Sequence, residues 1–153
     1  DEVSKSERDF FFLVSGYLKE MYRNPYEEKD ELFNFIPKGS IFVNENSHFA
    51  NSQPPHYYVA HSRATYIQIP QVVYGQMLEL YPSFKELYLS AMAEIQRNRR
   101  ARLSMLRMSK TTEKIAWVKE FRPDIYAELD RTTLAQFIGV SRASLYRALD
   151  NVS

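Results

Sequence analysis

The sequence contains no cysteine among its 153 residues. Disulfide bonds are therefore excluded, as are zinc sites and iron–sulfur clusters held by thiolates. With only four glycines, a glycine-rich loop that would cradle phosphates is also disfavoured. No apolar run approaches the roughly 20 residues that a membrane-spanning helix needs, and no signal peptide is recognisable. These absences fit a protein of the reducing cytoplasm.

The residues that are present suit one or two compact units. Hydrophobic residues make up 44% of the chain and aromatic residues 14%, while charged residues are at an ordinary 25%. The sequence begins at Asp1 without a methionine and stops abruptly at Ser153. We expect it to be part of a longer protein.

Positive charge is concentrated in the second half of the chain. Residues 1–70 carry 7 Lys and Arg against 10 Asp and Glu, a net charge of −3. Residues 71–153 carry 13 against 9, a net charge of +4. Either a polyanionic partner binds this half, or the surplus lies on a solvated helical surface.

The first half has the pattern of antiparallel β-structure. Short runs rich in Phe, Tyr, Val and Ile are separated by turn residues such as Asn24-Pro25 and Pro37-Lys38-Gly39. The runs that we expect to be strands are 10–17, 18–23, 32–36, 41–43, 57–60 and 64–69. The pattern predicts an antiparallel β-roll resembling a jelly roll or small barrel over residues 1–82, which also include a short exit helix at 71–80.

A long helix is predicted over residues 83–108. Seven of its residues follow one another at alternating intervals of four and three, the spacing of a coiled-coil seam. They are Phe84, Tyr88, Ala91, Ile95, Asn98, Arg102 and Met105. The stripe is either buried against the chain's own β-structure or forms the interface of a parallel dimer, with Asn98 and Arg102 setting the register.

The last segment, 109–153, carries the most specific pattern. After a helix over 112–121 that Pro123 ends, residues 129–150 read LDRTTLAQFIGVSRASLYRALD. Asp130 can cap a first helix that Gly139 ends, and Ser141 can cap a second helix that begins at Arg142. Ala135 is small where the two helices cross, and Leu145 packs back between them. The spacing predicts a helix-turn-helix.

The second helix of this motif presents a basic face. Arginine can donate two hydrogen bonds to a guanine edge in the major groove, and a helix N-terminus can bind a phosphate. The alternative is a helical hairpin whose arginines face solvent. The residues that we expect at DNA are Ser141, Arg142, Ala143, Ser144 and Arg147, with Thr132 or Thr133 at a phosphate.

The segment TTLAQFIGVSRASLYRAL resembles the DNA-binding domain of the Crp/Fnr family of bacterial transcription regulators. FFFLVSGYLKEMYR is similar to a strand pair of the family's sensor barrel, IPKGSIF to the turn after it, and ATYIQIPQVVYGQMLELYPSF to the end of that barrel and its first helix. The resemblance implies a homodimer with a β-roll sensor and winged helices. It favours the dimer reading of residues 83–108, and near-palindromic double-stranded DNA and RNA polymerase as partners. It also implies that the first strands and the wing are missing from this sequence.

Two departures from the family pattern affect the binding of a cyclic nucleotide and the DNA base that the recognition helix reads. Members that bind cyclic nucleotides hold the phosphate with an Arg-Ser or Arg-Ala pair, whereas the corresponding stretches here read Val43-Asn44-Glu45-Asn46 and Pro54-Pro55-His56. Because no arginine remains there and the prolines lack amide donors, we expect no binding of cyclic AMP in that manner. The sequence assigns neither an effector nor a role as activator or repressor. In the recognition helix, Ala143 stands where many family members have a glutamate, so we expect the base read there to differ and a thymine methyl group to be accepted instead.

Other chemistry has little support. His48, His56 and His61 lack the His-x-His pattern of a cupin-type metal barrel, so no metal ligand and no catalytic residue is assigned. Tyr57, Tyr58 and Tyr66 could line a ligand pocket but are more typical of a barrel core. The alternative function is a ligand-binding or metal-dependent β-barrel whose helical tail only forms oligomers.

Overall fold

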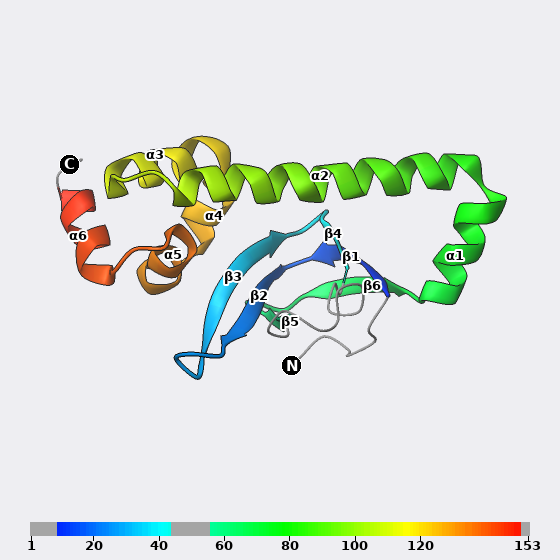
Figure 1. Cartoon of the computed structure of the whole chain (residues 1–153), viewed down its shortest axis with the longest axis horizontal. Coiled ribbons are helices and arrows are strands. Elements are labelled where there is room, and N and C mark those ends of the chain that lie inside the picture. The colour runs from blue at the N-terminus through cyan, green and yellow to red at the C-terminus, as the bar shows by residue number, and fades with distance from the viewer. Residues whose placement is uncertain (1–8, 44–55, 151–153) are drawn as a thin grey trace. The chain divides into compact units, whose positions relative to one another are not determined.

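The computed structural model describes residues 9–43 and 56–150 (Figure 1). Within the described ranges, no helix is both long and apolar enough to cross a membrane. His48 and most of the two stretches discussed for cyclic-nucleotide binding lie outside them. The chain divides into two compact units between Arg97 and Asn98, inside one continuous helix.

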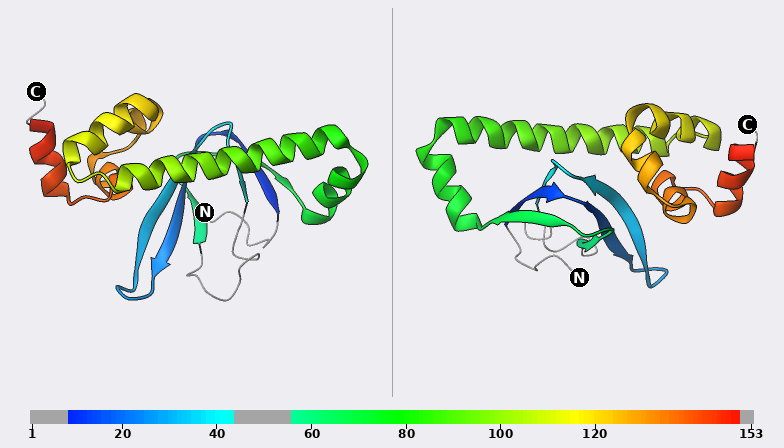
Figure 2. Two further views of the ribbon diagram at one scale, coloured as in Figure 1. Left: turned by 45° about the horizontal axis from the view of Figure 1, so that its top comes forward. Right: turned by 180° about the vertical axis from the view of Figure 1, so that it is seen from behind.

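The first unit contains six strands in two three-stranded sheets, seen from further sides in Figure 2. The sheet orders are β4-β1-β6 and β3-β2-β5, and all the strand pairs are antiparallel, as the sequence predicts. The strands are β1 (Phe10–Ser15), β2 (Tyr17–Asn24), β3 (Lys29–Pro37), β4 (Ile41–Val43), β5 (His56–Ala60) and β6 (Thr65–Ile69).

A single glycine connects β1 in one sheet to β2 in the other. Gly16 lies between β1 and β2 with φ of +80°, in the left-handed region that favours glycine. A Cβ atom at this position would lie 2.4 Å from the carbonyl oxygen of Arg63. The chain therefore passes from one sheet to the other without a longer connection.

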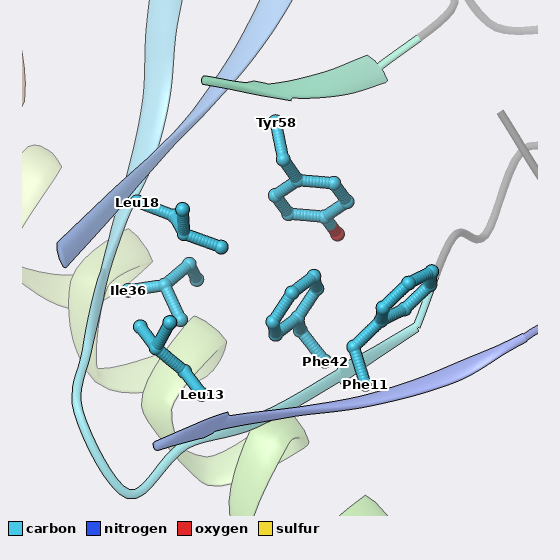
Figure 3. Close-up of a cluster of buried hydrophobic side chains, with 6 residues drawn as sticks. All are labelled: Phe11, Leu13, Leu18, Ile36, Phe42 and Tyr58. Carbon is cyan, nitrogen blue, oxygen red and sulfur yellow. The ribbon is translucent and has the colours of Figure 1, made fainter. Parts of the chain in front are cut away.

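Alternation along the strands builds the core between the sheets. Figure 3 shows six buried side chains that point towards one another from both sheets: Phe11, Leu13, Leu18, Ile36, Phe42 and Tyr58. The rings of Phe11 and Phe42 stack with their centroids 5.0 Å apart. Tyr58 belongs to this core and Tyr66 packs against it, which favours the core interpretation for these two tyrosines.

Two helices follow the sheets. Asp9, which is buried, accepts a hydrogen bond from the backbone N–H of Gln71 at 3.1 Å and so satisfies the start of α1 (Gln71–Leu80). The long helix α2 (Pro82–Leu106) begins with proline. A backbone N–H at this first position would have no acceptor within the helix, so its absence in proline costs no hydrogen bond. Its first turns carry Phe84 and Tyr88, which with residues of β1, β4 and β6 line a wholly apolar cavity of about 210 Å³.

The second unit is helical. It contains the end of α2 followed by α3 (Thr111–Phe121), α4 (Pro123–Glu128), α5 (Arg131–Ile138) and α6 (Arg142–Asp150). The sequence pattern does not predict α4, because Pro123 indicates the end of the preceding helix. Proline does end α3, but it also stands at the first position of α4, where its fixed φ suits a helix.

The core of this unit is formed by apolar side chains of all its helices. Its members, all at most 5% exposed, are Met105, Ile115, Val118, Ile125, Leu129, Leu134, Ala135, Phe137, Ile138, Leu145 and Ala148. Met105 is fully buried here. Of the two interpretations of the stripe, burial within the same chain is therefore the better one for this residue.

Candidate nucleic-acid interface

The first helix of the predicted motif, α5, begins at an aspartate cap. The carboxylate of Asp130 accepts hydrogen bonds from the backbone N–H of Thr133 at 2.9 Å and from its hydroxyl at 2.7 Å. Thr133 is buried, so its hydroxyl stabilises the helix start and is not presented to a phosphate. Of the two threonines predicted at DNA, only Thr132 is exposed.

The turn between α5 and α6 depends on Gly139. Its φ of 67° and ψ of 44° are left-handed helical, as the sequence predicts. Its N–H donates to the carbonyl of Gln136, and the N–H of Val140 donates to the carbonyl of Ala135. The chain thereby passes from α5 to α6 within the three residues 139–141.

The second helix, α6, begins after Ser141. The hydroxyl of Ser141 accepts a hydrogen bond from the backbone N–H of Ser144 at 3.1 Å and donates to its hydroxyl at 2.9 Å. Leu145 and Ala148 are the buried residues of α6, which packs against α3 and α5. The two are one helical turn apart, so one face of α6 is buried and the opposite face is free to contact a partner.

The exposed side of α6 is here called the recognition face. It consists of Arg142, Ala143, Tyr146 and Arg147, all of which are exposed. Arg147 lies along the helix, with Nε 3.4 Å from the carbonyl oxygen of Ala143 and Nη2 3.4 Å from the hydroxyl of Ser144. These long contacts leave Arg147 able to donate to a ligand.

Three exposed or cation-binding residues near the motif, Tyr146, Tyr126 and Arg131, were not among the residues predicted to contact DNA. Tyr146, 44% exposed, lies within the recognition face, and its position in the helical repeat would have indicated this. The ring of Tyr126 in α4 lies 5.0 Å from the ammonium of Lys119 and 5.5 Å from the guanidinium of Arg131. Arg131 is exposed at the start of α5 and adds positive charge beside Thr132.

The predicted dimer stripe is divided between several environments. Tyr88 packs its ring 5.5 Å from that of Phe10 in β1, and Ala91 is buried. Arg102 donates a hydrogen bond to the carbonyl oxygen of Phe137 at 3.2 Å. In these parts of the stripe, burial within the same chain is therefore the better interpretation. Asn98 is exposed and Ile95 is half-buried.

The histidines are placed among aromatic and acidic side chains. His56 lies 3.0 Å from the buried carboxylate of Glu20, and its ring meets those of Tyr22 and Phe33. His61 packs against Phe35. Among the described residues, no three His, Cys, Asp or Glu side chains are grouped so that they could hold a metal ion.

No model of a protein family matches the chain, and no curated protein matches it either.

Comparison of the structure identifies the fold. One match is a protein from Listeria monocytogenes that contains a cyclic nucleotide-binding domain. The alignment covers 99% of this chain and 77% of that one, with a TM-score of 0.72 and 16% identity. A CRP-family transcriptional regulator from Thermus thermophilus also covers 99%, over 80% of its own chain, with a TM-score of 0.71 and 10% identity. The c-di-GMP-responsive global regulator CLP from Xanthomonas campestris gives 0.70 at 13% identity, covering 99% of this chain over 82% of its own.

Proposed function

The chain has the fold of Crp/Fnr regulators, and we propose that it is a sequence-specific DNA-binding transcription regulator of that family, acting as a homodimer. The observation that carries the proposal is the recognition face of α6. This face carries two exposed arginines on a helix that is capped by Ser141, follows the tight turn at Gly139, and buries its opposite side, as a helix-turn-helix requires. The fold matches support the same function.

Base contacts are assigned to the first turns of α6. Arg142 and Arg147 each can donate two hydrogen bonds to a guanine edge, and each such contact contributes about 1–3 kcal/mol of discrimination between base pairs. Ser141 and Ser144 at the start of α6, with Thr132 and Arg131 at the start of α5, supply phosphate contacts. Ala143 between the arginines offers a methyl group and suits a thymine.

A dimer would place two such faces on successive major grooves of a near-palindromic site, roughly 34 Å apart. The helix α2 carries a second coiled-coil repeat, displaced by one residue from the predicted stripe. Its members are Leu89, Met92, Gln96, Arg99, Leu103 and Leu106. Leu89 and Leu103 are 57% and 59% exposed, so this face of the helix offers two large apolar side chains to a second copy. This repeat is the proposed dimer seam.

The β-unit is proposed as an effector domain that does not bind cyclic AMP. The support is the sequence of the two stretches that lack a phosphate-binding arginine. Calorimetric titration of the protein with cyclic AMP should give no heat of binding, and micromolar affinity would contradict this part of the proposal.

Selection of duplex DNA from a random pool tests the function. The protein is used at physiological salt beside an Arg142→Ala/Arg147→Ala variant and a control variant, Arg97→Ala/Arg100→Ala, which removes the same charge from exposed positions of α2. We expect a palindrome to be enriched by the wild type and by the control, but not by the α6 variant. Because phosphate contacts alone bind any sequence and are weakened by salt, comparable enrichment by the α6 variant would contradict the proposal.

A further inference from the structure

The C-terminal end of α5 has an unusual set of hydrogen-bond donors. The last four carbonyls of a helix have no partner within the helix. Here the carbonyls of Ala135 and Gln136 accept from backbone amides of the turn, at 3.0 and 3.2 Å. The carbonyls of Phe137 and Ile138 accept from side chains that belong to other helices.

Both of these side chains are cationic. Arg102 of α2 donates from Nη2 to the carbonyl of Phe137 at 3.2 Å, and its guanidinium lies 5.0 Å from the centroid of the Phe137 ring. Lys114 of α3 donates from Nζ to the carbonyl of Ile138 at 3.1 Å. We call these four residues the carbonyl clasp.

The clasp has a favourable electrostatic arrangement. A helix carries partial negative charge at its C-terminus, so cations there stabilise it, and hydrogen bonds from a charged donor are stronger than neutral ones. Lys114 is only 7% exposed and Phe137 only 1%, so water competes little for these contacts. The arrangement thus ties the end of α5 to two helices at once.

The position of the clasp relates it to DNA binding. Ile138 is followed by the turn residues 139–141, and α6 begins at Arg142. Because the turn is short and itself hydrogen-bonded, fixing the end of α5 fixes the start and direction of α6.

We propose that Arg102 and Lys114 are positioning residues that hold the helix-turn-helix against α2 and α3, and so set the half-site spacing at which the two recognition faces of the dimer bind DNA. This inference rests on the proposed function.

Binding to operators of different spacing tests the proposal. The selected palindrome is prepared with its half-sites at the selected spacing and displaced by one or two base pairs in either direction. Arg102→Met and Lys114→Met keep the length of the side chain but remove its charged donors. We expect each to bind the best operator roughly tenfold more weakly and to lose most of the preference between spacings. Arg102→Lys should recover part of that preference, since it retains a charged donor.

The matched control is Arg100→Met, an exposed arginine of the same helix. It should keep the wild-type spacing preference. If the clasp variants bind every operator more weakly but keep that preference, the contacts only stabilise the fold and the positioning role is wrong.

A second readout does not need DNA. Amide hydrogen exchange of Gly139 and Val140 should be faster in Arg102→Met than in Arg100→Met, while the amides of α3 exchange alike. Unchanged exchange at Gly139 and Val140 would contradict the claim that the clasp holds the turn in place. If the wild type selects no operator, the proposed function fails, and exchange alone decides whether the clasp holds the turn.

Discussion

Gly139 shows how one residue determines the direction of the helix that follows it. Its left-handed φ of 67° is a conformation that residues with a Cβ atom rarely adopt. A Cβ built on Gly139 would also lie 3.1 Å from Cδ2 of Leu106. By contrast, Gly75 lies within α1, and beyond its chain neighbours and the adjacent helix backbone no described atom lies within 4 Å of such a Cβ.

These two glycines should respond oppositely to the same substitution. We expect Gly139→Ala to lower the free energy of unfolding by about 1–2 kcal/mol, because alanine is strained at positive φ. Gly75→Ala should raise it by about 0.5–1 kcal/mol, because alanine restricts the unfolded chain and favours a helix. Urea denaturation of both variants checks this, and a stabilised Gly139→Ala protein would contradict the account of the turn.

At the residue scale, the sequence is most informative where the signal is local. The caps Asp130 and Ser141 and the turn at Gly139 could be predicted, since each depends on neighbours within three residues. The roles of Arg102 and Lys114 could not, because their partners in α5 are 35 and 24 residues away along the chain. Sequence position does not reveal such a contact until the helices are packed.

At the scale of elements, the hairpin of β2 and β3 contains a titratable contact. The phenol of Tyr22 donates to the carboxylate of Glu31 at 2.5 Å, and the side-chain amide of Asn24 donates to the same group at 3.0 Å. The hydrogen bond from Tyr22 lowers the pKa of Glu31 below 4.5. The same hydrogen bond raises the pKa of Tyr22 above 10.0.

The contact should therefore stabilise the hairpin only within a window of pH. The contribution of Glu31 is present above about pH 4.5 and is lost as the pH falls through its lowered pKa. The contribution of Tyr22 is present below about pH 10 and is lost as the pH rises through its raised pKa. Tyr22→Phe should thus cost about 1 kcal/mol of stability near pH 7, and less at either extreme.

Denaturation curves recorded from acid to alkaline pH measure this difference. Tyr26→Phe removes the same hydroxyl from a ring that is 94% exposed, and it should be neutral throughout. A cost for Tyr22→Phe that does not change with pH would show that the carboxylate is not its partner.

The helix α2 shows why an element can be predicted while its contacts are not. The helix itself is found within two residues of its predicted bounds. Two heptad repeats run along it, one residue apart, and periodicity alone cannot indicate which one faces the chain's own sheet. The structure buries Ala91 and Met105 of the first repeat and exposes Leu89 and Leu103 of the second.

At the scale of the whole molecule, the exposed repeat of α2 predicts how two copies associate. Leu103→Glu would place a charge in the proposed seam, and we expect it to shift the protein from dimer to monomer at micromolar concentration. Ala101→Glu introduces the same charge at an exposed position on another side of the helix, and it should leave the dimer intact. Light scattering coupled to size-exclusion chromatography measures both, and a dimeric Leu103→Glu protein would contradict the assigned seam.

The fold of the whole molecule was predictable to the level of its class. Strand alternation and turn residues indicated an antiparallel β-roll, and the helix-turn-helix spacing indicated the motif in the second unit. The order of strands in each sheet is not contained in local patterns, because β1 pairs with β4 and β6 across long stretches of chain. Those pairings follow from packing of the whole unit.

Affinity for single-base-pair variants of the selected half-site shows whether α6 reads bases. Wild type and Arg147→Ala are compared by fluorescence anisotropy at physiological salt, with exposed Lys119→Ala as control. We expect Arg147→Ala to lose about 1–3 kcal/mol of discrimination at one base pair and to keep it at the others. Equal weakening on every variant, or a wild type that does not discriminate between them, would contradict base reading by α6.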